Sequence, residues 1–120
     1  MDTSTGADAP TADVVVLDYG LGNLRSVTRG LERAGAAGRI EDDPEAINTA
    51  DAIVLPGVGA FGDGMENAGP FREPLSAAAN AGRPILGICL GMQMLLTSSE
   101  EADRAGQGDV QGLSIVPGRN

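Results

Sequence analysis

Hydrophobic and polar residues follow one another along the chain in blocks that predict strands and helices in turn. The segments 13–18 and 52–55 are apolar runs, as expected for strands that are buried on both faces of a sheet. The segments 38–42, 84–89 and 113–116 are shorter or more interrupted, and we predict strands there as well.

Helical periodicity is clearest in residues 23–35. Apolar residues recur there every three or four positions, arginine and glutamate occupy the other face, and Gly35 ends the segment. We also predict helices over 70–82 and 90–100, and a short helix or turn at 44–50 that begins with proline. Strands and helices therefore alternate along most of the chain.

This alternation with short connections predicts an α/β fold with an open, mostly parallel sheet flanked by helices. Ligands of such sheets gather at the carboxyl ends of the strands, which gives most weight to the loops 18–23, 56–64 and 89–92. Residues 1–12 are small and polar without a basic start, so we expect a disordered tail there, followed by one domain over 13–120.

The net charge of −9 and the absence of lysine narrow the classes of partner. An acidic surface repels nucleic acid and anionic membranes, so we expect neither as a partner. The longest apolar stretch is too short to span a bilayer. Cys89 is the one cysteine and there is no histidine, so we expect no disulfide, no metal site and a reducing, cytoplasmic location.

The loop after the third predicted strand contains a G-x-G-x-x-G pattern at 57–62. A dinucleotide-binding loop follows the first strand and is followed about 20 residues later by an acidic residue, and this pattern meets neither condition. A phosphate-binding Walker loop needs a lysine that the chain lacks. Two interpretations stay open: a loop that only turns the chain, or backbone N–H groups directed at a ligand.

Cys89 stands in a G-x-C-x-G pattern, with Gly87 and Gly91 on either side, where a predicted strand meets a predicted helix. This pattern favours a nucleophile elbow, the cysteine counterpart of G-x-S-x-G. The following helix would stabilise a thiolate, and the N–H of Leu90 could donate to an oxyanion. The alternative is a small buried cysteine in the core.

Three segments together resemble a known family. "GICLGMQ" is similar to the nucleophile motif of triad, or class I, glutamine amidotransferases. With "VVVLDYGLGNLRSV" and "LPGVGAFGDGM", the resemblance narrows to the glutaminase subunits of imidazole glycerol phosphate synthase and covers residues 13 to 120. It implies a flavodoxin-like amidotransferase fold, present here as its N-terminal part and incomplete at the C-terminus, with no cofactor.

The resemblance also implies roles for individual residues. Cys89 would attack the γ-carbonyl of glutamine to give a thioester and ammonia. The glycine loop would supply an oxyanion strand beside the glutamine pocket, with Leu90 as a second donor. Gln93 resembles a position near the bound glutamine. The residues that this implies for oxyanion and glutamine binding are Gly57, Val58, Gly59, Leu90 and Gln93.

Ammonia in this family passes to a partner cyclase with a (β/α)₈ barrel, which implies a heterodimer in histidine biosynthesis. The loops that match would lie near that partner, so Tyr19, Asn23 and Phe61 are candidate interface residues. For Tyr19 and Phe61, the alternative is ordinary loop packing. For Arg25 the resemblance implies no role, and we expect a solvated residue at the start of a helix.

The sequence departs from the family at the proton carriers. Class I members use a histidine and a glutamate near the C-terminus, and this chain has no histidine. Glu100 and Glu101 do not match the glutamate and are expected to be solvated. We therefore expect no glutamine hydrolysis by the 120-residue chain alone.

Two explanations for the missing proton carriers stay open: a truncated copy of a working glutaminase, or a complete, degenerate protein that binds without catalysis. Two alternative functions stay open as well. One is a glutaminase that serves another ammonia acceptor, and the other is a non-catalytic, flavodoxin-like binding module.

Overall fold

The computed structural model describes residues 12–96, 98–99 and 110–117. Its centre is a parallel sheet of four strands in the order β2-β1-β3-β4. The strands are Val14–Leu17 (β1), Gly38–Glu41 (β2), Ala52–Leu55 (β3) and Ile85–Gly87 (β4). The first four predicted strands are therefore confirmed, with boundaries that differ by at most two residues at either end.

The helices connect these strands and extend beyond the last of them. They are Leu24–Arg33 (α1), Phe61–Ala68 (α2), Arg72–Asn80 (α3) and Leu90–Met94 (α4). Two 3₁₀ turns, Pro44–Thr49 (η1) and Gly69–Phe71 (η2), complete the connections. A separate antiparallel pair joins Ser98–Ser99 (β5) to Val110–Gln111 (β6).

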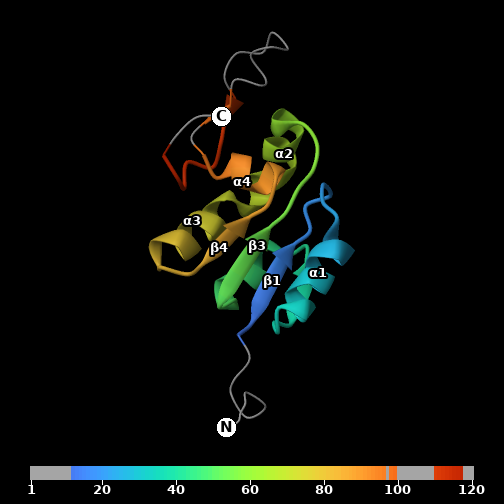
Figure 1. The fold of residues 1–120 in the computed structure, drawn as a ribbon. Helices are drawn as coiled ribbons and strands as arrows, with labels where there is room; N and C mark the ends of the chain where they lie inside the picture. Colours follow the sequence, from blue (N-terminus) through green and yellow to red (C-terminus); the bar gives the residue numbers. More distant parts are fainter. Residues whose placement is uncertain (1–11, 97, 100–109, 118–120) are drawn as a thin grey trace.

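Helices lie on both sides of the sheet, as Figure 1 shows for α1 and α3. Helix α1 packs on one face, where Val14, Val16 and Val54 are buried. The other face carries the larger core, which buries residues of η1, α2, α3 and α4. Among the described residues, strand β4 has no neighbouring strand on its outer side, and Leu86 on it is 55% exposed.

The chain after β4 differs from the prediction. The helix expected over 90–100 ends at Met94, and the strand predicted at 113–116 is wrong. Backbone N–H groups of residues 113–116 donate instead to carbonyls at the end of α4. A β-carbon on Gly112 would stand 2.1 Å from the carbonyl oxygen of Leu96, so glycine lets the two segments approach.

Helix α2 was missed by the sequence prediction, which treated residues 56–64 as a loop. Phe61, Met65 and Ala68 are spaced as one helix face and are all buried against the core. Two other predictions, the tail at 1–12 and the solvated Glu100 and Glu101, lie outside the described residues apart from Ala12.

Candidate active site

Cys89 lies between a strand and a helix at the carboxyl edge of the sheet. Strand β4 ends at Gly87 and α4 begins at Leu90. The backbone of Cys89 has φ 52° and ψ −117°, a conformation that costs a residue with a side chain about 1–3 kcal/mol. The thiol is free and the residue is exposed. This geometry matches the strained strand-to-helix turn of a nucleophile elbow.

The two glycines around Cys89 stand where no side chain fits. A β-carbon on Gly91 would lie 1.7 Å from the carbonyl oxygen of Leu55. A β-carbon on Gly87 would lie 2.6 Å from the Cα of Met92. Both contacts are with backbone atoms, so a larger residue at either position would push α4 away from the sheet.

The glycine loop after β3 lies directly against the turn that carries Cys89. The N–H of Leu90 donates to the carbonyl of Gly57 at 3.1 Å. Gly57 is buried, whereas Val58 and Gly59 are exposed, and Gly59 has φ 115°. The fold therefore brings together the cysteine and the glycine loop that the sequence analysis singled out separately.

Two backbone donors of this site already have acceptors within the chain. The N–H of Val58 donates to the carbonyl of Leu21 at 3.2 Å, and the N–H of Leu90 is bonded to Gly57. An anionic oxygen formed at Cys89 would have to replace these carbonyls as the acceptor. Stabilising such an oxygen through these amides therefore requires the loop or the turn to rearrange.

Gln93 lies in α4, and its N–H donates to the carbonyl of Cys89 at 3.1 Å. It is half-buried, so it is held against the elbow that it follows. The neighbouring Met92 is 52% exposed, and Val58 on the glycine loop is 57% exposed. Both segments next to Cys89 thus present an apolar side chain to solvent.

Two of the candidate interface residues are buried. Phe61 is fully buried and Tyr19 is 7% exposed, and both belong to the main core. The Tyr19 hydroxyl donates to the carbonyl of Pro56, and burial raises the pKa of Tyr19 to about 12. Both rings are therefore packed inside this chain, as the alternative of ordinary loop packing expects.

Asn23, the third candidate interface residue, is exposed at the start of α1. Its side-chain oxygen accepts a hydrogen bond from the N–H of Ser26 at 3.4 Å. Asn23 is therefore the N-cap of the helix, and its side chain satisfies a backbone donor that the helix cannot.

Sequence reasoning missed two residues that hold the loop around Tyr19. The Asn67 side chain in α2 donates to the Tyr19 carbonyl at 3.2 Å, and the Asp18 carboxylate accepts from the N–H of Gly20 at 3.1 Å. The Asp-x-Gly spacing is a signal for such a turn. No local pattern signals the contact of Asn67.

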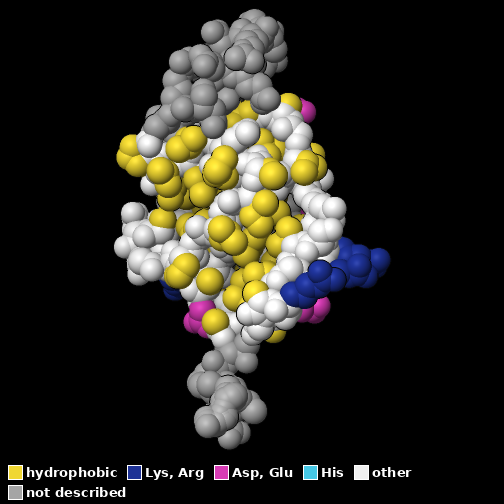
Figure 2. Space-filling view, in the orientation of Figure 1, with side chains coloured by type: hydrophobic (Ala, Val, Ile, Leu, Met, Phe, Trp, Pro, Cys, Tyr) yellow, Lys and Arg dark blue, Asp and Glu magenta, His cyan; other side chains and the backbone are white. Residues whose placement is uncertain are grey.

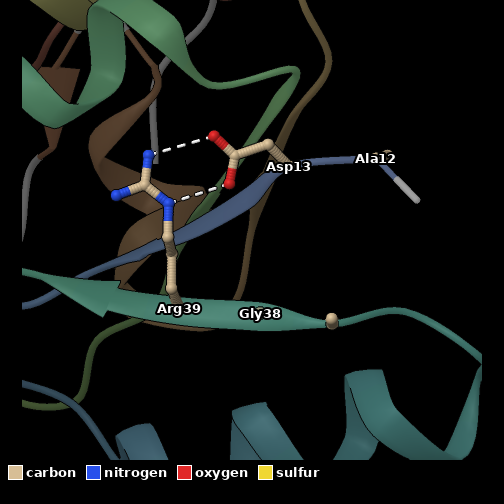
Figure 3. Close-up of a pocket in the computed structure, with 5 residues that line it drawn as sticks. Ala12, Asp13, Gly38 and Arg39 are labelled. Atoms are coloured by element: carbon tan, nitrogen blue, oxygen red, sulfur yellow. Dashed lines mark hydrogen bonds and ion pairs between the residues drawn. The ribbon is translucent and has the colours of Figure 1, made fainter. Parts of the chain in front are cut away.

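A separate pocket of about 290 Å³ lies at the opposite, amino-terminal edge of the sheet (Figure 3). Arg39 in this pocket binds both oxygens of Asp13, at 2.8 and 3.0 Å, and also bonds Glu41. The Arg39 guanidinium holds the pKa of the Asp13 carboxyl below its usual value. The charge of Arg39 is thus matched within the chain, at the end of the sheet remote from Cys89.

Within the described residues, no group of three or more cysteine, aspartate or glutamate side chains is placed to hold a metal ion. None of the helices in that part of the chain is long and apolar enough to cross a membrane.

Comparison with known proteins identifies one family model and relatives that carry one name. Residues 15–114 match the family model described as glutamine amidotransferase class-I. The imidazole glycerol phosphate synthase subunit HisH of Halobacterium salinarum is 70% identical over 120 residues, which is all of this chain and 55% of that protein.

Two further relatives carry the same name. The HisH subunit of Natronomonas pharaonis is 73% identical over 110 residues, or 92% of this chain and 51% of the relative. That of Methanosarcina mazei is 50% identical over 106 residues, or 88% of this chain and 50% of the relative. The chain spans about half the length of the curated relatives that it matches.

Proposed function

The chain belongs to the class-I glutamine amidotransferase family, and from that premise we propose that it serves in the glutaminase subunit of imidazole glycerol phosphate synthase. The observation that carries this proposal is the strained Cys89 elbow in contact with the glycine loop. The 70% identity to a HisH subunit supports the choice of this subunit among amidotransferases.

The proposed reaction proceeds through a thioester on Cys89. The sulfur attacks the γ-carbonyl carbon of glutamine, a C–S bond forms, and the C–N bond breaks. The proton of the thiol goes to the departing nitrogen, which leaves as ammonia, and water then cleaves the thioester to give glutamate. The residues proposed to bind glutamine or the oxyanion are Gly57, Val58, Gly59, Leu90 and Gln93.

A proton carrier is needed between the thiol and the departing ammonia. These 120 residues include no histidine, so no imidazole among them can carry that proton. We therefore expect the chain alone to release no ammonia from glutamine, which an enzymatic assay for ammonia would check. Steady, glutamine-dependent release by the purified chain would contradict this expectation.

A hybrid polypeptide tests the function itself. The 120 residues would be followed by the part of the Halobacterium salinarum subunit that they do not match, and combined with that organism's cyclase subunit. We expect glutamine-dependent ammonia release that Cys89→Ser lowers by more than about a thousandfold. Glu73→Gln, at an exposed position of α3 outside the elbow and the glycine loop, is the control and should leave the rate unchanged.

The same hybrid separates the alternatives. Ammonia release that the cyclase neither accelerates nor consumes would favour a glutaminase for another acceptor. A correctly folded hybrid with no glutaminase activity would favour a binding module. For the complete assembly we propose a cytoplasmic heterodimer, since a single free thiol suits a reducing compartment.

We also propose that α1 contributes to the surface that meets the partner subunit. Arg25, Arg29 and Arg33 recur every fourth position of α1 and are all exposed. Figure 2 shows basic side chains gathered over this helix. The other arginines in the described part of the chain are bonded to carboxylates or backbone carbonyls, namely Arg39, Arg72 and Arg83.

Such a row on a chain of net charge −9 fits an acidic partner surface near the candidate site, because α1 begins at the same edge of the sheet as Cys89. We expect the double variant Arg29→Glu, Arg33→Glu to weaken binding of the hybrid to the cyclase, most strongly at low salt. Glu73→Lys on α3 is the control with a reversed charge on the other layer. If both variants lost the same amount of affinity for the cyclase, the proposal that α1 belongs to the partner surface would be contradicted.

A further inference from the structure

Tyr19 connects two loops that are far apart in the sequence. It is the chain's one tyrosine, its ring is packed in the main core, and its hydroxyl donates to the carbonyl of Pro56 at the end of β3. Pro56 is fully buried, so its carbonyl depends on a protein donor. The hydroxyl supplies that donor at the point where β3 passes into the glycine loop.

The hydroxyl also lies against the next residue of the loop. A β-carbon on Gly57 would stand 1.9 Å from the Tyr19 oxygen and 3.2 Å from the carbonyl oxygen of Leu21. Gly57 is the residue whose carbonyl accepts from Leu90, directly after Cys89. The tyrosine oxygen is therefore in contact with the backbone that connects the glycine loop to the elbow.

The tyrosine itself is fixed from the other side. Asn67 donates to its carbonyl from α2, and the turn at Asp18 orders the chain beside it. Val58, one residue beyond Gly57, donates to Leu21 in the same loop as Tyr19. The loop after β1 and the loop after β3 thus meet at one hydroxyl group, and the second loop is bonded to the elbow through the carbonyl of Gly57.

We infer that Tyr19 is a positioning residue for the candidate site. Its hydroxyl holds the Pro56–Gly57 backbone in place and thereby keeps the N–H groups of Val58 and Leu90 on their carbonyl acceptors. A chain without this hydroxyl would release these amides more often toward an anionic oxygen at Cys89. The catalytic meaning of this inference rests on the proposed glutaminase function, but its structural content does not.

The variant Tyr19→Phe removes the hydroxyl and keeps the ring. We expect amide hydrogen exchange of Val58 and Leu90 to accelerate about tenfold, the factor for losing one net hydrogen bond, while the amides of β1 stay unchanged. Thr28→Val is the matched control, because it also removes one hydroxyl group, which donates to the Leu24 carbonyl within α1, without changing a contact of Tyr19. Unchanged exchange in Tyr19→Phe, or equal acceleration in Thr28→Val, would overturn the inference.

The reactivity of the Cys89 thiol distinguishes a positioning role of Tyr19 from a merely structural one. With p-nitrophenyl acetate, the sulfur of Cys89 bonds to the carbonyl carbon through an oxyanion, and p-nitrophenolate leaves. With iodoacetamide, the sulfur displaces iodide and no oxyanion forms. We expect Tyr19→Phe to raise the ester rate severalfold relative to the iodoacetamide rate, with Cys89→Ser as background. A constant ratio would overturn the inference.

Neither measurement uses glutamine, so the hybrid enzyme tests the proposed function separately. Where Tyr19→Phe does not fold, the unsubstituted chain still gives a test by nuclear magnetic resonance. The hydroxyl proton of Tyr19 should exchange slowly and show a nuclear Overhauser contact to the α-protons of Gly57. Rapid exchange of that proton in the folded chain would overturn the inference.

Discussion

Alkaline pH is expected to destabilise the folded chain through one side chain, Tyr19. Its hydroxyl is buried and donates to the carbonyl of Pro56, and burial raises its pKa from 10.0 to about 12. A tyrosinate has no proton to donate. Ionisation would therefore place a charge inside the core and leave the Pro56 carbonyl without its donor.

The sign and the size of the effect follow from the two pKa values. The tyrosine of the unfolded chain ionises near pH 10, whereas that of the folded chain keeps its proton up to about pH 12. Between these values the unfolded state has released a proton that the folded state retains, so the free energy of unfolding falls as pH rises. Two units of pKa correspond to a loss of up to about 2.7 kcal/mol, a large part of a small domain's stability.

The composition of the chain allows the ionisation of Tyr19 to be followed separately from other groups. The chain has one tyrosine and no tryptophan, so the near-ultraviolet absorbance of tyrosinate reports Tyr19 alone. Urea unfolding at several pH values gives the free energy, and Tyr19→Phe, which has no group to ionise, should lack the fall. A tyrosinate transition near pH 10 in chain that is still folded would refute the reasoning.

Three further predictions concern packing, association and acid. Gly91→Ala should lower the free energy of unfolding by at least about 3 kcal/mol, because its β-carbon would meet a backbone oxygen, whereas Gly30→Ala, with open space around it, should raise it by about 1 kcal/mol in the same thermal scans. Leu86→Lys on β4, an edge of the sheet in the described part of the chain, should reduce self-association in sedimentation equilibrium; an unchanged association constant would show that copies of the chain do not pair through β4. Since Arg39 lowers the pKa of Asp13, the stability gained from their pair is present at neutral pH and lost as pH falls. Arg39→Met should therefore cost more stability near pH 7 than near pH 3, measured by urea midpoints.

The strands of the central sheet could be predicted because buried parallel strands leave a direct mark in the sequence. Residues 52–55 are apolar without interruption, and the structure gives the same boundaries. The apolar run at 113–116 has a similar composition but forms no strand, because its backbone bonds to the end of α4. A short apolar run shows that a segment is buried and does not show what its amide groups bind.

At helix α2 the prediction failed in the opposite way, because the structure has a regular element where the sequence predicts a loop. Gly62 and Gly64 give its first turns the composition of a loop, and the apolar spacing from Phe61 is visible only when those glycines are disregarded. Gly64 lets α2 approach α4 closely, because a β-carbon there would stand 2.8 Å from the sulfur of Met94 and that side chain would have to shift. A glycine that serves close packing between helices looks the same in the sequence as one that serves a turn.

The candidate site was predictable in part for a general reason. The carboxyl ends of parallel strands meet at one edge of a sheet, so the glycine loop and Cys89 were expected to lie close together. The hydrogen bond from Tyr19 to Pro56 joins residues that no local pattern connects. Only the assembled core shows that the ring of this tyrosine is buried.

The strand order of the central sheet also has a consequence for how the chain is synthesised. Strand β1 lies between β2 and β3, and its residue Val14 is paired with Gly38 on one side and Ala52 on the other. None of these pairs is a hairpin, so each requires a helical crossover to close first, which slows folding. During translation β1 precedes both of its neighbours, so one of its edges stays unpaired until β3 has left the ribosome. Of the four strands of the central sheet, β1 is the one whose residues are all buried in the folded chain, so the segment that waits for its partner is an apolar one.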